Sequence, residues 1–156
     1  MDILDTPPKN GISFNYKGAP IDAELRPLWR ISLITVILLQ LCSGNKANSK
    51  KIQALYSLVS SEKKRKLYLS QKFKDSPLNI RFDPLVDRAV DWGVGSQLFE
   101  LDEAKSIKLT AKGISFGKRI IDDSNIFILE KNFMNNFKKS HFTEKRIMNL
   151  ITGEMV

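Results

Sequence analysis

Residues 81–117 read RFDPLVDRAVDWGVGSQLFELDEAKSIKLTAKGISFG, and this stretch decides the fold that the sequence predicts. Asp83 is a favourable helix N-cap, and Pro84 follows at the first helical position, where its missing N–H costs nothing. The helix that begins there can end at Gly93 or Gly95, because glycine readily adopts the backbone conformation that closes a helix. The apolar residues that recur at roughly helical spacing before the helix ends are Leu85, Ala89, Val90 and Trp92.

Two short strands follow this helix. Residues 98–101 and 106–109 are strand candidates, and the polar residues 102–105 between them have the length of a hairpin turn. Thr110 then begins another helix, within the sequence LTAKG. A helix, a two-stranded ribbon and LTAKG leading into a helix resemble the back half of a winged helix-turn-helix domain. In such a domain the ribbon is the wing, and the helix before it is the recognition helix.

The rest of the chain predicts further helices. Residues 25–43 form a helix that is apolar on every side, so we expect it to be the central, most buried one. Asn48 or Ser49 caps the next helix, and Thr143 begins the last one. The inward stripe of the helix after residue 48 is Ile52, Leu55, Tyr56 and Val59. A second stripe, after the helix that Thr110 begins, is Ile126, Leu129, Phe133 and Phe137.

We therefore expect a mainly α-helical protein in three parts. Residues 1–24 form an extended N-terminal arm, which contains several prolines and glycines and one short strand. Residues 25–123 form a winged helix-turn-helix domain with a small two-stranded wing. Residues 124–156 form a C-terminal helical extension that packs on the domain or on a partner.

Composition excludes several classes of protein. The 156 residues contain one cysteine, Cys42, and one histidine, His141, which allows no intramolecular disulfide and leaves too few ligands for a structural zinc site. Cys42 lies in an apolar run and is predicted to be a buried small hydrophobe. The N-terminal sequence MDILDTPPKNG lacks the apolar core of a secretion signal, and the longest apolar run, residues 31–42, is too short to span a bilayer. We expect a cytoplasmic protein.

The candidate catalytic groups are weak. Asp91 with residues 103–105, an acid-x-Lys sequence, has the residue types of a metal nuclease, but the same residues are typical of a polar hairpin tip. Asp122 and Asp123 are adjacent, so their side chains point in different directions from a helix. His141 has no serine or cysteine motif around it. We therefore expect a protein that is not an enzyme and that uses no metal or cofactor.

The net charge of +8 is unevenly distributed. Residues 77–104 contain two arginines and six acidic residues, so their net charge is −4. In the helix before the wing, Asp83, Asp87 and Asp91 recur every four residues, with only Arg88 to oppose them. An acidic recognition helix is repelled by phosphates, so we expect it to dock on a basic protein surface instead of reading DNA.

Residues 45–76 carry the opposite charge. Nine lysines and arginines oppose two acidic residues there, which makes the net charge +7. A lysine-rich surface of this kind binds the nucleic-acid backbone without reading sequence, although many such surfaces are simply solvated. The residues predicted to form a nucleic-acid-binding patch are Lys46, Lys50, Lys51, Lys63, Lys64, Arg65 and Lys66.

Four stretches of the chain resemble one protein family. They are LWRISLITVILLQL (28–41), KKIQALYSLVSS (50–61), FDPLVDRAVDWGV (82–94) and IKLTAKG (107–113). Together they resemble the small middle component of bacterial ABC-type three-component systems, the group that includes the Lamassu-like anti-phage defence systems. The resemblance implies a winged-helix subunit that works with an SMC-like ABC ATPase and with a separate effector, such as a nuclease.

Two functional hypotheses follow. The first is a non-enzymatic accessory subunit that bridges the ATPase and the effector, with additional contact to the backbone of double-stranded DNA. The residues expected to bind protein partners in that role are Asp83, Asp87, Arg88, Asp91, Phe133 and Phe137. The second is a winged-helix transcription regulator that forms a homodimer through its terminal helices and binds a specific operator.

Overall fold

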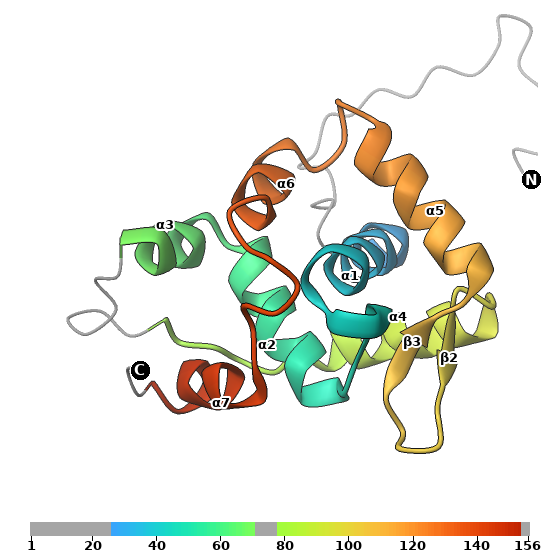
Figure 1. The fold of residues 1–156 in the computed structure, drawn as a ribbon, viewed down its shortest axis with the longest axis horizontal. Helices are drawn as coiled ribbons and strands as arrows, with labels where there is room; N and C mark the ends of the chain where they lie inside the picture. The colour runs from blue at the N-terminus through green and yellow to red at the C-terminus, as the bar shows by residue number, and fades with distance from the viewer. Residues whose placement is uncertain (1–25, 71–77, 154–156) are drawn as a thin grey trace, which may run out of the picture.

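An apolar helix organises the fold. The computed structural model describes residues 26–70 and 78–153, and in it α1 (Pro27–Leu41) lies behind and between the other helices (Figure 1). Pro27 occupies the first turn of α1, where a proline preorganises the helix. Residues 33–38 are all buried, which confirms that this helix is the central one. A helix that is apolar all round can be stable in water only when other elements cover every side of it.

The elements that cover α1 come from both halves of the chain. The helices α2 (Ser49–Ser60), α4 (Pro84–Gly95) and α5 (Ala111–Asp122) all pack against it. Close approach of α5 depends on Gly117, where a Cβ atom would lie 3.0 Å from the Cδ2 atom of Leu39 and 3.1 Å from the Cγ2 atom of Thr35. The helix that follows the ribbon therefore lies directly on α1.

The predicted helix starts are confirmed by the cap geometry. The side chain of Asn48 accepts a hydrogen bond from the backbone N–H of Lys51 at 2.8 Å, at the start of α2. Asp83 caps α4 and Thr110 caps α5 in the same way. Thr143 caps α7 (Glu144–Thr152). Each cap satisfies an N–H group that has no partner within its own helix.

Within the described residues the sheet has three strands instead of the two that we predicted. Its order is β1-β3-β2, and both pairings are antiparallel: β1 is Lys46–Ala47, β2 is Phe99–Leu101 and β3 is Ile107–Leu109. The additional strand, β1, comes from the link between α1 and α2, after the short helix η2 (Ser43–Asn45). Two residues are too few to show the alternation that identifies a strand in a sequence. The protein is thus mainly α-helical with a small antiparallel sheet.

The C-terminal helices belong to the same core. The helices α6 (Ile128–Met134) and α7 pack on α2, and α6 also contacts α1. Phe142 is 1% exposed and joins the core between them. The described part of the predicted extension therefore packs on the rest of the chain. A further helix, α3 (Glu62–Ser70), follows α2 after a single residue.

The predicted stripe from Ile126 to Phe137 is wrong in part. Leu129 is 62% exposed, whereas Phe127 is buried. The single long helix that the stripe assumed does not form, because Phe127 adopts a left-handed conformation (φ 52°) and α6 ends at Met134. Ile126 and Phe137 therefore lie outside the helix whose periodicity they were thought to share.

The position of Trp92 also differs from the prediction. Its spacing suggested the buried face of α4, but Trp92 lies on another face of that helix. The buried face of α4 consists of Val86, Ala89, Val90 and Gly93. These positions follow the i, i+3, i+4, i+7 pattern of one helix face, and residue 92 lies off that face. Trp92 is accordingly 61% exposed.

Two further predictions concern the N-terminal arm and membrane-spanning helices. The predicted N-terminal arm, residues 1–24, lies outside the described residues. The longest helix within residues 26–70 and 78–153 is α1, with 15 residues. Nowhere in those two ranges is a helix long and apolar enough to cross a bilayer.

We predict opposite effects for two glycines of α4. At Gly93 a Cβ atom would overlap the ring of Phe99, whereas at Gly95 nothing lies within 4 Å of that position. Gly93→Ala should lower the free energy of unfolding by about 1–3 kcal/mol, because overpacking displaces Phe99. Gly95→Ala should leave it unchanged or raise it by up to about 1 kcal/mol, because alanine favours helix. Chemical denaturation of both variants measures the difference, and equal effects would contradict the close packing of α4 on β2.

Candidate functional site

The predicted basic patch is divided between the two ends of α2. Lys46 and Lys50 lie at the start of this helix, whereas Lys63, Lys64 and Lys66 lie on α3, beyond its end. The 12 residues of α2 span about 18 Å at 1.5 Å per residue. The seven residues therefore do not form one continuous surface.

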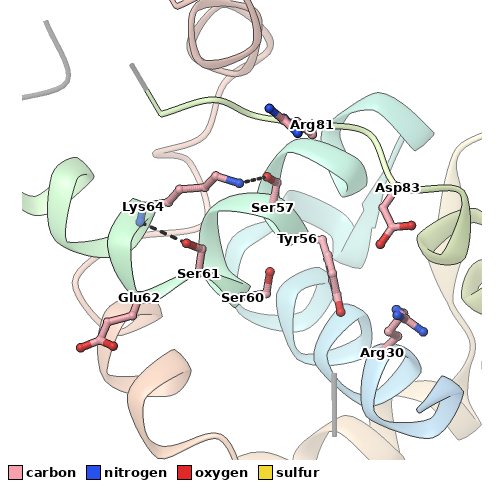
Figure 2. A pocket seen from close by; sticks show the side chains of 9 residues that line it. All are labelled: Arg30, Tyr56, Ser57, Ser60, Ser61, Glu62, Lys64, Arg81 and Asp83. Carbon is pink, nitrogen blue, oxygen red and sulfur yellow. Dashed lines mark hydrogen bonds between the residues drawn. The ribbon is translucent and has the colours of Figure 1, made fainter. Parts of the chain in front are cut away.

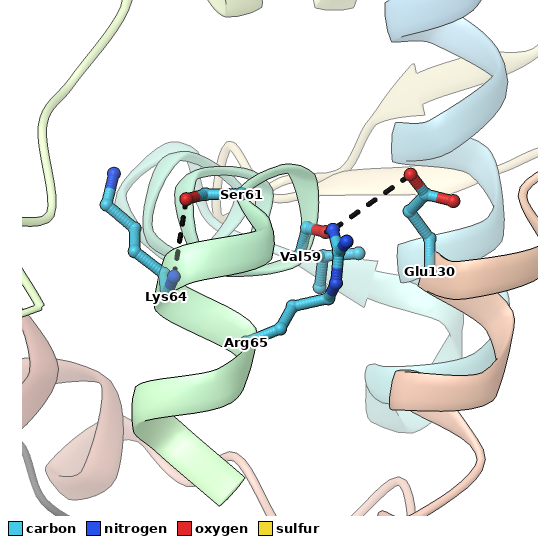
Figure 3. Close-up of polar contacts among 5 residues, drawn as sticks. All are labelled: Val59, Ser61, Lys64, Arg65 and Glu130. Carbon is cyan, nitrogen blue, oxygen red and sulfur yellow. Dashed lines mark hydrogen bonds and ion pairs between the residues drawn. The ribbon is translucent and has the colours of Figure 1, made fainter.

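Two members of that patch point into the protein. Arg65 is 8% exposed, and its Nη1 atom donates a hydrogen bond to the carbonyl oxygen of Val59 at 2.6 Å and lies 4.0 Å from a carboxylate oxygen of Glu130 (Figure 3). It connects α3 to the end of α2 and to α6. Lys51 is 9% exposed, on the part of α2 that other elements cover. Arg65 and Lys51 are therefore held by packing within the chain and are not part of an exposed basic surface.

Two lysines of α3, Lys64 and Lys66, also have partners within the chain. Lys66 forms an exposed ion pair with Glu62 at 2.8 Å, an i, i+4 pair on the helix surface. The Nζ atom of Lys64 donates a hydrogen bond to the Oγ atom of Ser57 at 2.8 Å and faces a pocket (Figure 2). Burial lowers the pKa of Lys64, and the nearby Arg81 lowers it further. Lys64 therefore lies in the lining of the pocket and not on the open surface of α3.

A different group of lysines gathers beside the sheet. Lys46 of β1 lies directly opposite Lys108 of β3, and both are exposed. Lys139 donates a hydrogen bond from Nζ to the Oδ1 atom of Asn45 at 2.6 Å, which places it next to β1. Asp102 offsets part of this charge, at 3.6 Å from the Nζ atom of Lys46. We call Lys46, Lys108 and Lys139 the sheet-side basic surface. Sequence reasoning missed it because the β1–β3 pairing brings together residues that are more than 60 positions apart.

The aspartates before and within α4 do not form one uniform face. The carboxylate of Asp83 accepts the N–H of Leu85 at 2.9 Å as the helix cap. Asp87 accepts a hydrogen bond from the Nε2 atom of Gln53 at 3.0 Å, so it helps to hold α4 on α2. Asp91 is exposed near the end of the helix. Of the acidic residues predicted to bind a partner, Asp91 is the one that the geometry leaves best placed to do so.

Gln53 fastens the start of α4 to α2. Its Nε2 atom donates to the carbonyl oxygen of Asp83, and its Oε1 atom accepts the N–H of Asp83, both at 2.9 Å. The side chain is 3% exposed, so this amide is buried and satisfied at both ends. The position of α4 is therefore set by polar contacts as well as by its apolar face.

The outer surface of α4 combines charge with an aromatic ring. Arg88, Asp91 and Trp92 are all exposed, and Trp92 lies next to Asp91 in the last turns of the helix. An exposed tryptophan with polar neighbours is typical of a protein–protein contact. We call Arg88, Asp91 and Trp92 the α4 surface.

The predicted partner residues Phe133 and Phe137 instead form an aromatic cluster inside the chain. Phe133 is 3% exposed, and its ring lies 5.1 Å from that of Phe137 and 6.2 Å from that of Tyr68. Phe137 also packs against Phe142 at 5.3 Å. Contacts from α3 and from the segment before α7 therefore bury Phe133 and leave Phe137 partly buried.

His141 closes this cluster. Its Nε2 atom lies 2.7 Å from the hydroxyl oxygen of Tyr68 and 3.3 Å from the Nη1 atom of Arg146. A guanidinium can only donate, so the contact with Arg146 favours the tautomer in which Nε2 accepts. Burial lowers the pKa of His141, and the charge of Arg146 lowers it further. Both effects favour the neutral form of the histidine.

Burial determines the chemistry of Cys42, and a hydrogen-bonded turn determines that of residues 102–105. Cys42 is fully buried, and burial raises the pKa of its thiol to about 11, which keeps the nucleophilic thiolate scarce near neutral pH. Residues 102–105 form the predicted turn, in which the N–H of Lys105 bonds to the carbonyl oxygen of Asp102 at 2.9 Å. The Asp102 carboxylate accepts the N–H of Ser106 at 2.8 Å, and this bond holds the pKa of Asp102 below its usual value.

Comparison of the chain with models of protein families, with curated proteins and with solved structures found no match.

We predict a pH dependence of stability that comes from His141. Its folded-state pKa lies below the unfolded value of 6.5, so the unfolded chain takes up the proton first as the pH falls. This contribution is fully present above about pH 6.5 and is lost as the pH falls through the lower, folded pKa. Because the chain has a single histidine, His141→Gln should flatten the fall in the free energy of unfolding between about pH 7 and about pH 5. Denaturant titrations at several pH values measure the slope, and an unchanged slope in the variant would refute the assignment.

Proposed function

We propose that this chain is a winged-helix, non-enzymatic accessory subunit of a cytoplasmic anti-phage defence complex. In this role it links an SMC-like ABC ATPase to an effector subunit, as the sequence resemblance implies. The order of elements supports the winged-helix assignment: α1, β1, α2, α4 and then the β2–β3 ribbon, with β3 between β1 and β2 in the sheet. In this assignment α4 is the recognition helix, and α3 is an addition between α2 and α4.

The observation that carries the proposal is the α4 surface. The helix that would enter a DNA groove exposes Asp91 and Trp92, with Arg88 as its one exposed cation. Base readout in the major groove relies on donors such as arginine, lysine and asparagine, and a carboxylate beside phosphates is repelled. A basic protein surface would instead attract Asp91, and a pocket on that surface could bury the ring of Trp92. The surface is therefore suited to a protein partner.

The first experiment measures assembly with the native partners. The tagged full chain is recovered from its host at moderate salt, and the proteins that accompany it are identified by mass. A large ATPase with coiled-coil arms, present in stoichiometric amount, is the expected result. Recovery of a homodimer that binds a specific operator would favour the transcription regulator over the accessory subunit.

We predict that the α4 surface is needed for this assembly. Trp92→Ala together with Asp91→Lys should reduce recovery of the ATPase by about tenfold or more, because loss of a central tryptophan costs about 2 kcal/mol or more. Leu28→Ala is the matched control, because Leu28 is 66% exposed, against 61% for Trp92, and lies on a different helix. Equal recovery with the double variant and the control would contradict the proposed docking surface. Thermal unfolding of each variant confirms that the chain remains folded.

The auxiliary contact with DNA is assigned to the sheet-side basic surface. Its three lysines lie together beside the wing, whereas the lysines of α3 lie beyond the other end of α2. Contacts of this type depend on salt and are indifferent to base sequence. The proposed wing-side contact thus replaces the patch that the sequence suggested.

We predict that a double charge reversal separates the two groups of lysines. Lys108→Glu with Lys139→Glu should weaken binding to a double-stranded oligonucleotide and reduce the slope of log affinity against log salt by about 2, since each phosphate contact contributes about 0.9. Lys63→Glu with Lys66→Glu makes the same change in net charge on α3 and serves as the control. Fluorescence anisotropy over a salt series measures both slopes. Equal losses in the two variants would show that net charge alone, and not this surface, determines binding.

A further inference from the structure

A pocket of about 500 Å³ lies between α1, the end of α2, the start of α3 and the segment that leads into α4 (Figure 2). None of its residues belongs to the α4 surface or to the sheet-side basic surface. Ligand pockets in proteins have volumes of about 300–1,000 Å³, so this one is of the size that holds a small molecule. Its lining is polar and charged, which determines what kind of molecule fits it.

The charges in the pocket favour an anion. Three cationic side chains line it: Arg30 of α1, Lys64 of α3 and Arg81 of the segment before α4. Arg30 is 4% exposed, and Coulomb attraction is stronger where water is excluded. Two acidic residues also line the pocket, but each is engaged locally. The carboxylate of Glu62 pairs with Lys66 and points away from the arginines in Figure 2, and Asp83 accepts the N–H of Leu85.

Hydroxyl groups add hydrogen-bond donors. Ser57 accepts a hydrogen bond from the Nζ atom of Lys64, and Ser61 accepts one from the backbone N–H of Lys64 at 3.3 Å (Figure 2). A hydroxyl whose oxygen accepts from a cation or an amide still carries its own proton, so both serines can donate that proton to a ligand. Tyr56 and Ser60 are further hydroxyls in the lining. Cations together with several hydroxyl donors are the groups that bind a phosphate.

We infer that this pocket binds the phosphate group of a mononucleotide-sized ligand. Lys64 and Arg81 would hold the phosphate at the mouth, with the serine hydroxyls beside it and Arg30 beneath. The pocket volume of about 500 Å³ is many times the roughly 30 Å³ that one water molecule takes up. An inorganic phosphate alone would therefore leave most of the pocket to solvent. An organic group attached to the phosphate would fill that space. This inference stands independently of the proposed assembly.

The direction in which the pKa of Lys64 is shifted agrees with this arrangement of charges. Burial and the charge of Arg81 lower the pKa of Lys64, because both make its charged ammonium form less favourable. A phosphate between the two cations would favour the ammonium and raise the pKa of Lys64 again. The site is therefore arranged so that an anion relieves the repulsion between its own cations.

The test is a calorimetric titration of the full chain with three probes: AMP, adenosine and inorganic phosphate. AMP should bind saturably, at least about tenfold more tightly than inorganic phosphate, and adenosine should bind more weakly than AMP by a similar factor. Lys64→Gln and Arg81→Gln should each weaken AMP binding by about tenfold or more, the loss expected for a charged hydrogen bond. Both residues lie at or near the surface, so both variants are expected to fold.

Two matched controls remove exposed charges outside the pocket. Lys63→Gln removes the charge of the residue next to Lys64, and Arg119→Gln removes an exposed arginine from α5. Neither should change the affinity for AMP. Failure of AMP to bind in the millimolar range, or equal losses in the pocket variants and the controls, would overturn the inference. Inorganic phosphate binding as tightly as AMP would overturn the assignment to a nucleotide-sized ligand.

A second measurement does not depend on any variant. The amine of Lys64 lies in the lining of the pocket, so a bound ligand would shield it from an acylating reagent. Saturating AMP should slow the labelling of Lys64, measured by peptide mass, and leave that of Lys63 unchanged. Equal labelling of Lys64 with and without AMP would contradict occupation of the pocket.

Discussion

The burial of α1 is the constraint on which the rest of the structure depends. This helix is apolar on all sides, so it is stable only when α2, α4, α5 and the sheet all lie against it. Burial of a single leucine or isoleucine side chain contributes about 1.5–3 kcal/mol, and most residues of α1 are buried to this degree. The small residue Gly117 allows α5 to approach closely enough to complete the cover. The positions of the sheet, of α4 and of the pocket all follow from this arrangement.

Polar groups are placed where this apolar packing ends. Arg30 lies in the first turn of α1, at the edge of the core, and there it lines the pocket. Gln53 lies on the side of α2 that meets α4, and it satisfies the backbone of Asp83 in both directions. Arg65 satisfies the backbone at the end of α2, because it donates a hydrogen bond to the carbonyl oxygen of Val59. Gln53 and Arg65 thus each let two helices meet while they satisfy backbone groups at the contact.

Features that depend on local chemistry could be predicted from the sequence, and features that depend on tertiary contacts could not. The caps at Asn48, Asp83 and Thr110 were predictable because each cap bond lies within three residues. The exposure of a charged residue is decided by what packs over it, so Arg65 looked like a surface cation although α6 lies against it. Strand β1 was missed because its two residues become a strand only by pairing with β3. The α4 aspartates were recognised, but the contacts of Asp87 with α2 needed the fold.

Asp83 has two structural roles, because it caps α4 and also lines the pocket. Its backbone is also fastened to Gln53, one helical turn before the pocket residues Tyr56 and Ser57 on α2. A ligand that moves Asp83 would therefore move the first turn of the helix that carries Trp92. Thermodynamic linkage makes such an effect reciprocal, so a partner on α4 would change the affinity of the pocket by the same factor as a ligand changes that of α4. Asp83, the cap of α4, thus provides a physical connection through which ligand binding in the pocket and partner binding on the α4 surface could be coupled.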